Sequence, residues 1–377
     1  MTIDELQEIV LKNTAELAEL RHLLSKEKRV EKALDSLRCR LASWLEGFHR
    51  DKYKSTDQRL LTHALAEEIL IFDKLGYDIR SPGAHFALGV ASFLEGRNQS
   101  ALDYFKQFVE ATGSDDRNHG NAHYLSAMIC YNRGEIPRAI SHFEATFRAS
   151  PQTNRDWQCM IYVAELEFFR RDPPERIEMV LRDVEEGLRS VEDGSQLGLL
   201  KATLHLKWGN CCIGHLDREP KRPNLMVNNQ LALSHYKEAR EALKAARLGA
   251  DSLLPVIIDY SLAQALLLTG RLVDLSRSPA DLFAEVFRSL RRIVLTKREE
   301  IILAQSYLML GTCAIYSSRV SNDAAEIYLE HARNQTLSVP SDVCFYSCMT
   351  KELLSRDEFL YQIESYSNQL EQRTARR

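Results

Sequence analysis

Two pairs of side chains in this sequence have a spacing that could hold a metal ion. His119 and His123 are four residues apart, and so are Cys344 and Cys348, so each pair would share one face of a helix. Imidazole nitrogens and thiolates are common ligands of zinc, but a structural zinc site has four ligands. Neither pair is accompanied by a second pair at zinc spacing. We therefore expect no metal site and no cofactor.

No motif of catalytic chemistry accompanies these residues. The sequence contains no G-x-x-x-x-G-K-[ST] phosphate loop, no G-x-S-x-G nucleophile turn and no H-E-x-x-H zinc motif. Aspartate and glutamate are spread over segments with helical periodicity, where a solvated face is their usual position. Helical repeats bury their regular positions and leave loops for catalysis. The sequence therefore predicts a protein that is not an enzyme.

Composition and charge argue against nucleic acid as a partner. The chain has 377 residues, of which 27% are charged, and its net charge of −4 gives no bulk attraction to phosphate groups. Basic residues cluster between Arg288 and Arg298, but Glu299 and Glu300 follow them directly. No aromatic platform for stacking bases lies beside the cluster. We expect no nucleic-acid binding.

The sequence also argues against insertion into a membrane. No apolar run reaches the roughly 20 residues that span a bilayer. The first residues are acidic and lack the basic and apolar regions of a signal peptide. The cysteines are scattered at positions where a helix places small apolar residues, which is typical of reduced thiols. We expect a cytoplasmic protein.

The elements that would position any site are best defined between Pro82 and Pro151, where two segments have the same spacing. A small residue lets two helix backbones approach, a Gly seven positions later ends the first helix, and an Ala five positions further faces back across the crossing. A Phe four positions after the Ala fills the space below, and a Pro ends the unit. The residues are Gly89, Gly96, Ala101 and Phe105 in the first segment, and Ala127, Gly134, Ala139 and Phe143 in the second.

These helical hairpins resemble the tetratricopeptide repeat, a helix–turn–helix unit of about 34 residues. Weaker copies follow at Glu165, at Trp208-Gly209, at Leu262-Ala263 and at Leu310-Gly311. The resemblance implies an all-α fold, a right-handed α-solenoid of such hairpins behind an N-terminal coiled coil or helical bundle. We expect an N-terminal helical segment over residues 1–76, the repeat array over 77–340, and capping helices with a polar tail over 341–377.

The N-terminal segment begins with a narrow apolar stripe over residues 2–28. This pattern indicates a short coiled-coil seam, through which copies of the chain would form a homo-oligomer. It is equally typical of an amphipathic helix that packs on the rest of the N-terminal segment, and both interpretations stay open. The stripe consists of Ile3, Leu6, Val10, Leu17, Leu20 and Leu24.

The resemblance also implies a binding surface, because repeats of this family line a concave groove with fixed positions of each first helix. Aromatic residues with a polar tip and a flexible Met suit a surface that takes up a peptide or helix. The alternative for each residue is a place in the core. Some family members bind the C-terminal tail of a chaperone through basic and amide side chains at fixed groove positions. This chain has Phe86 and Tyr124 at such positions, so we expect it not to bind chaperone tails. The implied groove residues are Phe86, Val90, Phe93, Asn121, Tyr124, Met128, Tyr131, Tyr162, Phe169, Tyr260 and Gln264.

Together these features predict a non-catalytic scaffold or adaptor that binds a peptide or helix of a partner protein in the groove. A second hypothesis is a ligand-switched regulatory protein. The order of a helical N-terminal module and then repeats is similar to that of bacterial peptide-pheromone receptors, although residues 1–76 show no helix-turn-helix reader.

Overall fold

The fold is described from a computed structural model, which divides by its internal contacts into two units. Unit 1 contains Met1–Ile129 and Arg148–Ser150, and unit 2 contains Cys130–Phe147 and Pro151–Arg377. The boundaries expected at residues 76 and 340 stay predictions. The seam expected over residues 2–28 lies outside the described residues, apart from its last two. The described residues are 27–48, 56–77, 79, 81–113, 116–149, 154–191, 194–213, 228–246, 252–269, 278–295, 299–317, 320–348 and 350–375.

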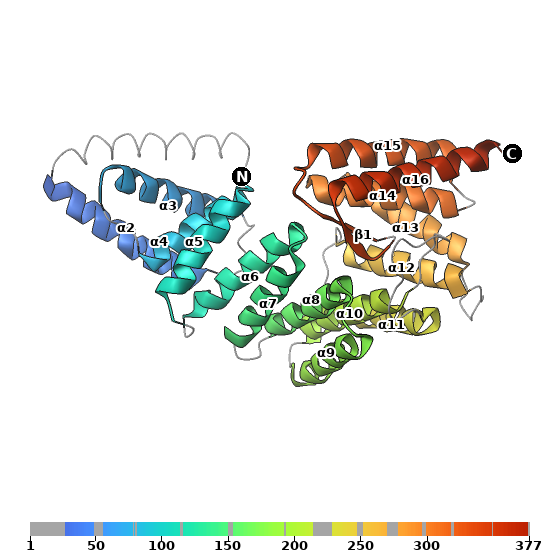
Figure 1. Ribbon diagram of the computed structural model, residues 1–377, viewed down its shortest axis with the longest axis horizontal. Coiled ribbons are helices and arrows are strands. Elements are labelled where there is room, and N and C mark those ends of the chain that lie inside the picture. The colour runs from blue at the N-terminus through green and yellow to red at the C-terminus, as the bar shows by residue number, and fades with distance from the viewer. Residues whose placement is uncertain are drawn as a thin grey trace. The chain divides into compact units, whose positions relative to one another are not determined.

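Unit 1 is built from α-helices that follow one another along the chain (Figure 1). Residue Ser81 shows why the third of them starts where it does, because its Oγ accepts a 3.2 Å hydrogen bond from Ala84 N. Pro82 follows at the first helical position, where its missing N–H costs nothing. The helices are α2 (Glu27–Gly47), α3 (Thr56–Lys74), α4 (Pro82–Leu94), α5 (Asn98–Ala111) and the greater part of α6 (Arg117–Asn132).

The turn and the crossing of the first expected hairpin are as the spacing predicts. Gly96 adopts a φ of +74°, which an L-residue rarely adopts, and joins α4 to α5. A Cβ on Gly89 would lie 2.6 Å from Cε1 of Phe105, so only a glycine lets this ring pack against the α4 backbone. Ala101 and Phe105 are buried.

Unit 2 continues with consecutive helices around one core. In two of the weaker copies a glycine again lets a large side chain of the next helix pack against its backbone. A Cβ on Gly209 would lie 2.5 Å from Tyr236 Cε1, and one on Gly311 would lie 2.7 Å from Leu329 Cδ2. The α-helices are the greater part of α7 (Ile136–Ala149), then α8 (Asn154–Arg170), α9 (Pro174–Gly187), α10 (Gly194–Cys212), α11 (Asn229–Leu243), α12 (Leu254–Thr269), α13 (Pro279–Val294), α14 (Glu300–Tyr316), α15 (Asn322–Ser338) and α16 (Arg356–Ala375), with a 3₁₀ turn at Leu188–Ser190.

These consecutive helical hairpins confirm the all-α fold class and the repeat resemblance. No described helix combines the length and the apolar character that crossing a bilayer requires. The eight cysteines, all within the described part of the chain, form no disulfide.

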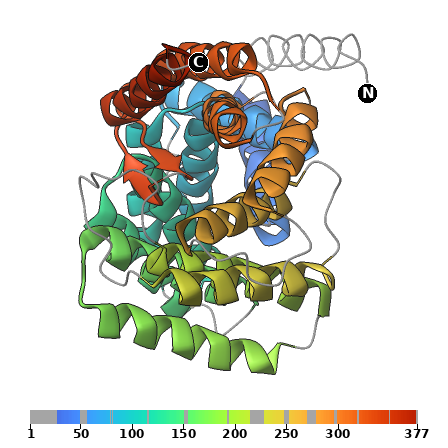
Figure 2. The same cartoon turned by 90° about the vertical axis from the view of Figure 1, so that its right-hand side faces the viewer.

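The C-terminal part departs from the expected run of capping helices. Residues 345–354 form an antiparallel hairpin of β1 (Phe345–Ser347) and β2 (Glu352–Leu354), in which Phe345 pairs with Leu354. The strands lie against α14 and α16 (Figure 2). Phe345 and Ser347 are buried while Tyr346 between them is half-buried, the alternation of a strand with one face in the core. A strand of three residues is too short for its alternation of buried and exposed side chains to be recognised in the sequence.

Candidate functional site

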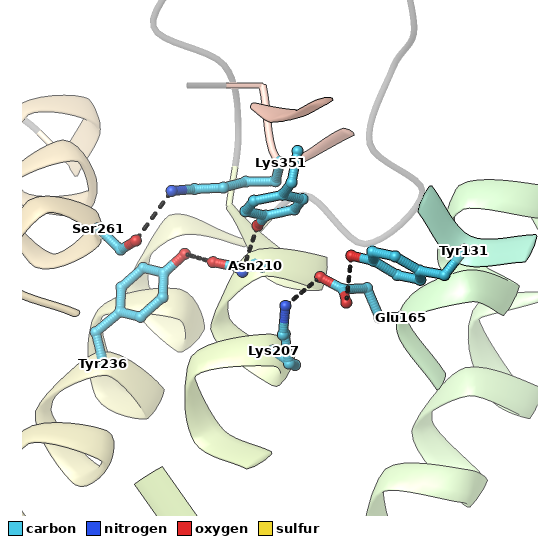
Figure 3. A network of polar contacts seen from close by, with 8 residues as sticks. Tyr131, Glu165, Lys207, Asn210, Tyr236, Ser261 and Lys351 are labelled. Atoms are coloured by element: carbon cyan, nitrogen blue, oxygen red, sulfur yellow. Dashed lines mark hydrogen bonds and ion pairs between the residues drawn. The ribbon is translucent and has the colours of Figure 1, made fainter. Parts of the chain in front are cut away.

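A network of polar side chains joins this hairpin to successive helices (Figure 3). In this view the helices contribute from the left, from below and from the right, and the hairpin contributes from above. The network consists of Tyr131 on α6, Glu165 on α8, Lys207 and Asn210 on α10, Tyr236 on α11, Ser261 on α12, and Tyr346 and Lys351 of the hairpin segment.

At one end of the network lies a buried ion pair. Lys207 Nζ is 2.6 Å from Glu165 Oε1, and the two side chains are 13% and 2% exposed. Tyr131 Oη donates a 3.4 Å hydrogen bond to the other oxygen of Glu165. Lys207 Nζ also lies 4.8 Å from the ring centroid of Tyr346 and 5.9 Å from that of Tyr162. Buried charges are stable only when they are paired. The Glu165 carboxylate and the Lys207 ammonium group therefore stabilise each other, and the aromatic rings add to the stabilisation of the ammonium group.

Asn210 connects the helices to the hairpin. Its Nδ2 donates a 2.7 Å hydrogen bond to Tyr346 Oη, and its Oδ1 accepts one of 2.9 Å from Tyr236 Oη. Burial raises the pKa of both tyrosines well above the ordinary value, so both hydroxyls stay protonated at neutral pH. The amide therefore has a defined orientation, with its donor toward the hairpin.

At the other end lies Lys351, whose side chain crosses from the hairpin to α12. Its Nζ donates hydrogen bonds of 2.9 Å to Ser261 Oγ and 2.6 Å to the Cys348 carbonyl, and lies 5.6 Å from the Tyr260 ring centroid. Lys351 is 2% exposed, and no described carboxylate forms an ion pair with it. Burial lowers its pKa to about 8. Its φ of +57° is rare for a residue other than glycine.

The hairpin is held on the helices by backbone contact as well. Cys344 N donates a 2.6 Å hydrogen bond to the Asn132 carbonyl at the end of α6. A Cβ on Gly134, whose φ is +69°, would lie 2.8 Å from Cys344 Sγ, so this glycine lets the strand approach closely. Phe345, fully buried, stacks on Phe359 of α16 at 4.7 Å between centroids. The strand therefore has one side chain anchored in the core and the next directed to the network.

The chemistry of this arrangement is recognition of a chain segment. Burial raises the pKa of the Cys348 thiol as it does those of the tyrosines, so these groups carry no charge at neutral pH and are poor nucleophiles. What the helices offer is a backbone acceptor, an oriented amide and a cation held over aromatic rings. An extended strand with a tyrosine satisfies all three.

Four of the eleven groove residues expected from the sequence lie in the core. The ring of Phe86 is surrounded by those of Trp44, Phe48, Phe105 and Phe108, at 4.9–5.9 Å between centroids. Helices pack on both sides of each first helix, so these side chains have no surface to offer a partner. The four, each at most 1% exposed, are Phe86, Val90, Tyr260 and Gln264.

The other seven are half-buried. Three of them pack together or against the hairpin in unit 2: Tyr131 lies 5.8 Å from Tyr162, and Phe169 lies 6.3 Å from Tyr346. The remaining four belong to unit 1, where Asn121 Nδ2 donates a 2.8 Å hydrogen bond to Asn118 Oδ1. These four are Phe93 on α4 and Asn121, Tyr124 and Met128 on α6.

Sequence reasoning missed the polar members of the network. Glu165 stands among Val163, Ala164 and Leu166, in a segment whose other charged residue is Glu167. A charge at a position of the buried stripe was the available signal, since such a charge needs a buried partner. Lys351 and Tyr346 carried no signal, because the segment around them was expected to be helical.

Comparison with known proteins gives likeness of fold. No protein-family model matches the chain, and no curated protein matches it. The chain is similar to a crystal structure of the APC/C hetero-tetramer Cut9-Hcn1, with 14% identity, 93% of this chain and 58% of that chain covered, and a TM-score of 0.47. It thus spans 58% of the length of that relative. It is also similar to a Rap protein complexed with competence and sporulation factor, with 10% identity, 90% and 99% covered, and a TM-score of 0.47.

Proposed function

We propose that this chain is a non-catalytic scaffold that binds an extended segment of a partner protein on the inner faces of its helical hairpins. The observation that carries the proposal is the docking of the chain's own strand β1 in unit 2. There Cys344, the residue before the strand, donates a backbone hydrogen bond to Asn132, and the Tyr346 hydroxyl of the strand accepts one from Asn210. Main-chain hydrogen bonds with side-chain pockets between them are a general mode of peptide recognition.

The inner face of unit 2 is covered by that strand, and Phe345 anchors the strand in the core. A partner would have to replace a fully buried aromatic ring to bind there. We therefore assign partner binding to the half-buried positions of unit 1, namely Phe93, Asn121, Tyr124 and Met128. Two aromatic rings, a flexible thioether and an amide favour a segment with apolar side chains on an extended or helical backbone.

Selection of peptides from a random library tests the proposal and does not require the partner to be identified. A phage-displayed library is selected on the purified full-length chain, and the enriched peptides are then titrated against variants. We expect Tyr124→Ala with Met128→Ala to weaken binding on the order of thirtyfold, because truncation of interface anchors costs about 2 kcal/mol or more. The thermal melt should stay close to that of the wild type.

The matched control is Met179→Ala, which removes the same side chain from a 56% exposed position on α9. This variant should bind the peptides as the wild type does. Enriched peptides that bind the Tyr124/Met128 variant with full affinity would overturn the assignment to unit 1. Failure of any peptide to be enriched would argue against the scaffold function itself.

A further inference from the structure

A separate cluster of metal-ligating side chains lies between α10 and α11. His205 Nδ1 is 3.2 Å from His235 Nδ1 and 3.3 Å from Glu238 Oε2. One ligand atom from each residue lies within 4.8 Å of the other two. His235 and Glu238 are three residues apart on α11, so both side chains leave the same face of that helix toward α10. None of the three belongs to the hairpin network.

We infer that His205, His235 and Glu238 form a site for a divalent transition-metal ion, with zinc the best match. Two imidazole nitrogens and one carboxylate oxygen are a common donor set for protein-bound zinc. Ligands about 2.0–2.1 Å from a tetrahedral zinc ion lie about 3.3–3.4 Å from one another. The observed 3.2 and 3.3 Å separations are those of two edges of such a tetrahedron.

The same 3.2 Å also suits an N–H···N hydrogen bond between two neutral imidazoles. The two arrangements are alternative states of one cluster, because the hydrogen bond uses the same two Nδ1 atoms that would bind the ion. A neutral imidazole carries its proton on either nitrogen. When Nδ1 binds the ion, the proton resides on Nε2, so coordination requires a change of tautomer and releases no proton.

The surroundings keep both rings ready for an ion. His205 and His235 are buried, and burial lowers the pKa of each, that of His235 to about 4. Both are therefore neutral at pH 7, the form that binds metal. Of the charges that act on His205, Glu238 and Glu185 raise its pKa, and Lys201 lowers it.

Packing and exposure define the rest of the site. The indole of Trp208 stacks on the His235 ring at 4.5 Å between centroids, which restricts the rotation of that ring. The side chain of Glu238 is 51% exposed, so solvent reaches this side and a water molecule would supply the fourth ligand. His235 Nε2 is buried and has no hydrogen-bond partner among the described residues. Since such partners contribute about 10–100-fold to metal affinity, we expect moderate affinity.

Isothermal titration of zinc chloride into the full-length chain, freed of metal with a chelator, tests the inference. We expect one zinc ion per chain at neutral pH. His205→Ala and His235→Ala should each weaken binding by about tenfold or more, and Glu238→Gln should weaken it as well. Glu238→Gln is the most informative variant, because its exposed side chain can change without disturbing the core, as circular dichroism would verify.

The matched control is His119→Ala, which breaks a second pair of histidines whose ring centroids lie 5.0 Å apart on α6. This variant should bind zinc as the wild type does. Titration with Co²⁺ adds a spectroscopic readout, since a tetrahedral site produces intense visible bands. Absence of zinc binding by the wild type would overturn the inference, as would binding that is unchanged in the folded Glu238→Gln and His205→Ala variants. Loss of zinc binding in His119→Ala alone would show that the ion binds on α6, and would equally overturn the inference.

Discussion

The amide of Asn210 donates a 2.7 Å hydrogen bond to the hydroxyl of Tyr346, 136 residues further along the chain. This contact joins a helix in the middle of unit 2 to the C-terminal hairpin. The hairpin is therefore anchored on a helix distant in sequence, and the energetics of the network can be tested one contact at a time.

Removal of the Tyr346 hydroxyl should loosen the hairpin. Tyr346→Phe removes the hydroxyl that accepts from Nδ2 of the buried Asn210, and an unpaired buried donor costs about 1–3 kcal/mol. Hydrogen exchange measured by mass spectrometry should show faster exchange in peptides that cover residues 343–354. Tyr328→Phe is the control, because the Tyr328 hydroxyl makes no hydrogen bond to any described residue. Equal exchange in wild type and Tyr346→Phe would contradict the role given to this contact.

The buried pair of Glu165 and Lys207 should show strong coupling in a double-mutant cycle. Lys207→Met leaves the Glu165 carboxylate buried without its cation, and loss of one partner of such a pair costs about 3–5 kcal/mol. The double change Glu165→Gln with Lys207→Met should cost much less than the sum of the two single changes, because no uncompensated charge remains. Urea unfolding supplies the free energies. Additive effects would mean that the two charges are solvated independently.

Lys351 should contribute stability that rises with pH in the alkaline range. Its pKa is about 8 in the folded chain against an ordinary value of 10.5, so the unfolded chain binds more protons between these values. The contribution of Lys351 to the free energy of unfolding should therefore increase from about pH 8 upward, on the order of 1 kcal/mol for each pH unit. Six cysteines act in the opposite direction over the same range, because burial raises the pKa of their thiols and these ionise first in the unfolded chain.

Lys351→Met should make the slope of the free energy of unfolding against pH more negative than in the wild type by that amount, because methionine fills similar space and does not titrate while the cysteines are unchanged. The comparison is made by chemical unfolding of both proteins at several pH values between about 8 and 9.5. A slope of the same size in the variant would assign the effect to another group.

Two glycines of α4 should respond in opposite ways to alanine. A Cβ on Gly89 would lie 2.6 Å from Phe105 Cε1, so Gly89→Ala should destabilise unit 1 by about 1–3 kcal/mol through overpacking. A Cβ on Gly83 would meet only Leu45 Cδ2, at 3.9 Å. Gly83→Ala should therefore be neutral or raise stability by up to about 1 kcal/mol, since alanine is the better helix former. Thermal melts of both variants check the crossing, and a Gly89→Ala variant as stable as the wild type would contradict it.

The sequence by itself determined the helical hairpins. Turn glycines such as Gly96, small residues such as Gly89 and the ring of Phe105 act within about 20 residues of one another, and their spacing is a local property of the chain. The sequence did not show whether an apolar helix face lines a groove or lies in the core. Phe86 and Tyr124 both have the periodicity of an inner face, but only the neighbouring helices decide which face is covered.

The tertiary structure alone decided the polar sites. His205 and His235 are 30 residues apart and Asn210 and Tyr346 are 136 apart, so no spacing rule connects either pair. The strand β1 is equally a product of its surroundings, because three residues form a strand only where helices α14 and α16 bury one face and a partner strand satisfies the backbone. A local pattern specifies what a segment can form, whereas contacts between distant segments decide which side chains meet, because these contacts depend on the packing of every helix between them.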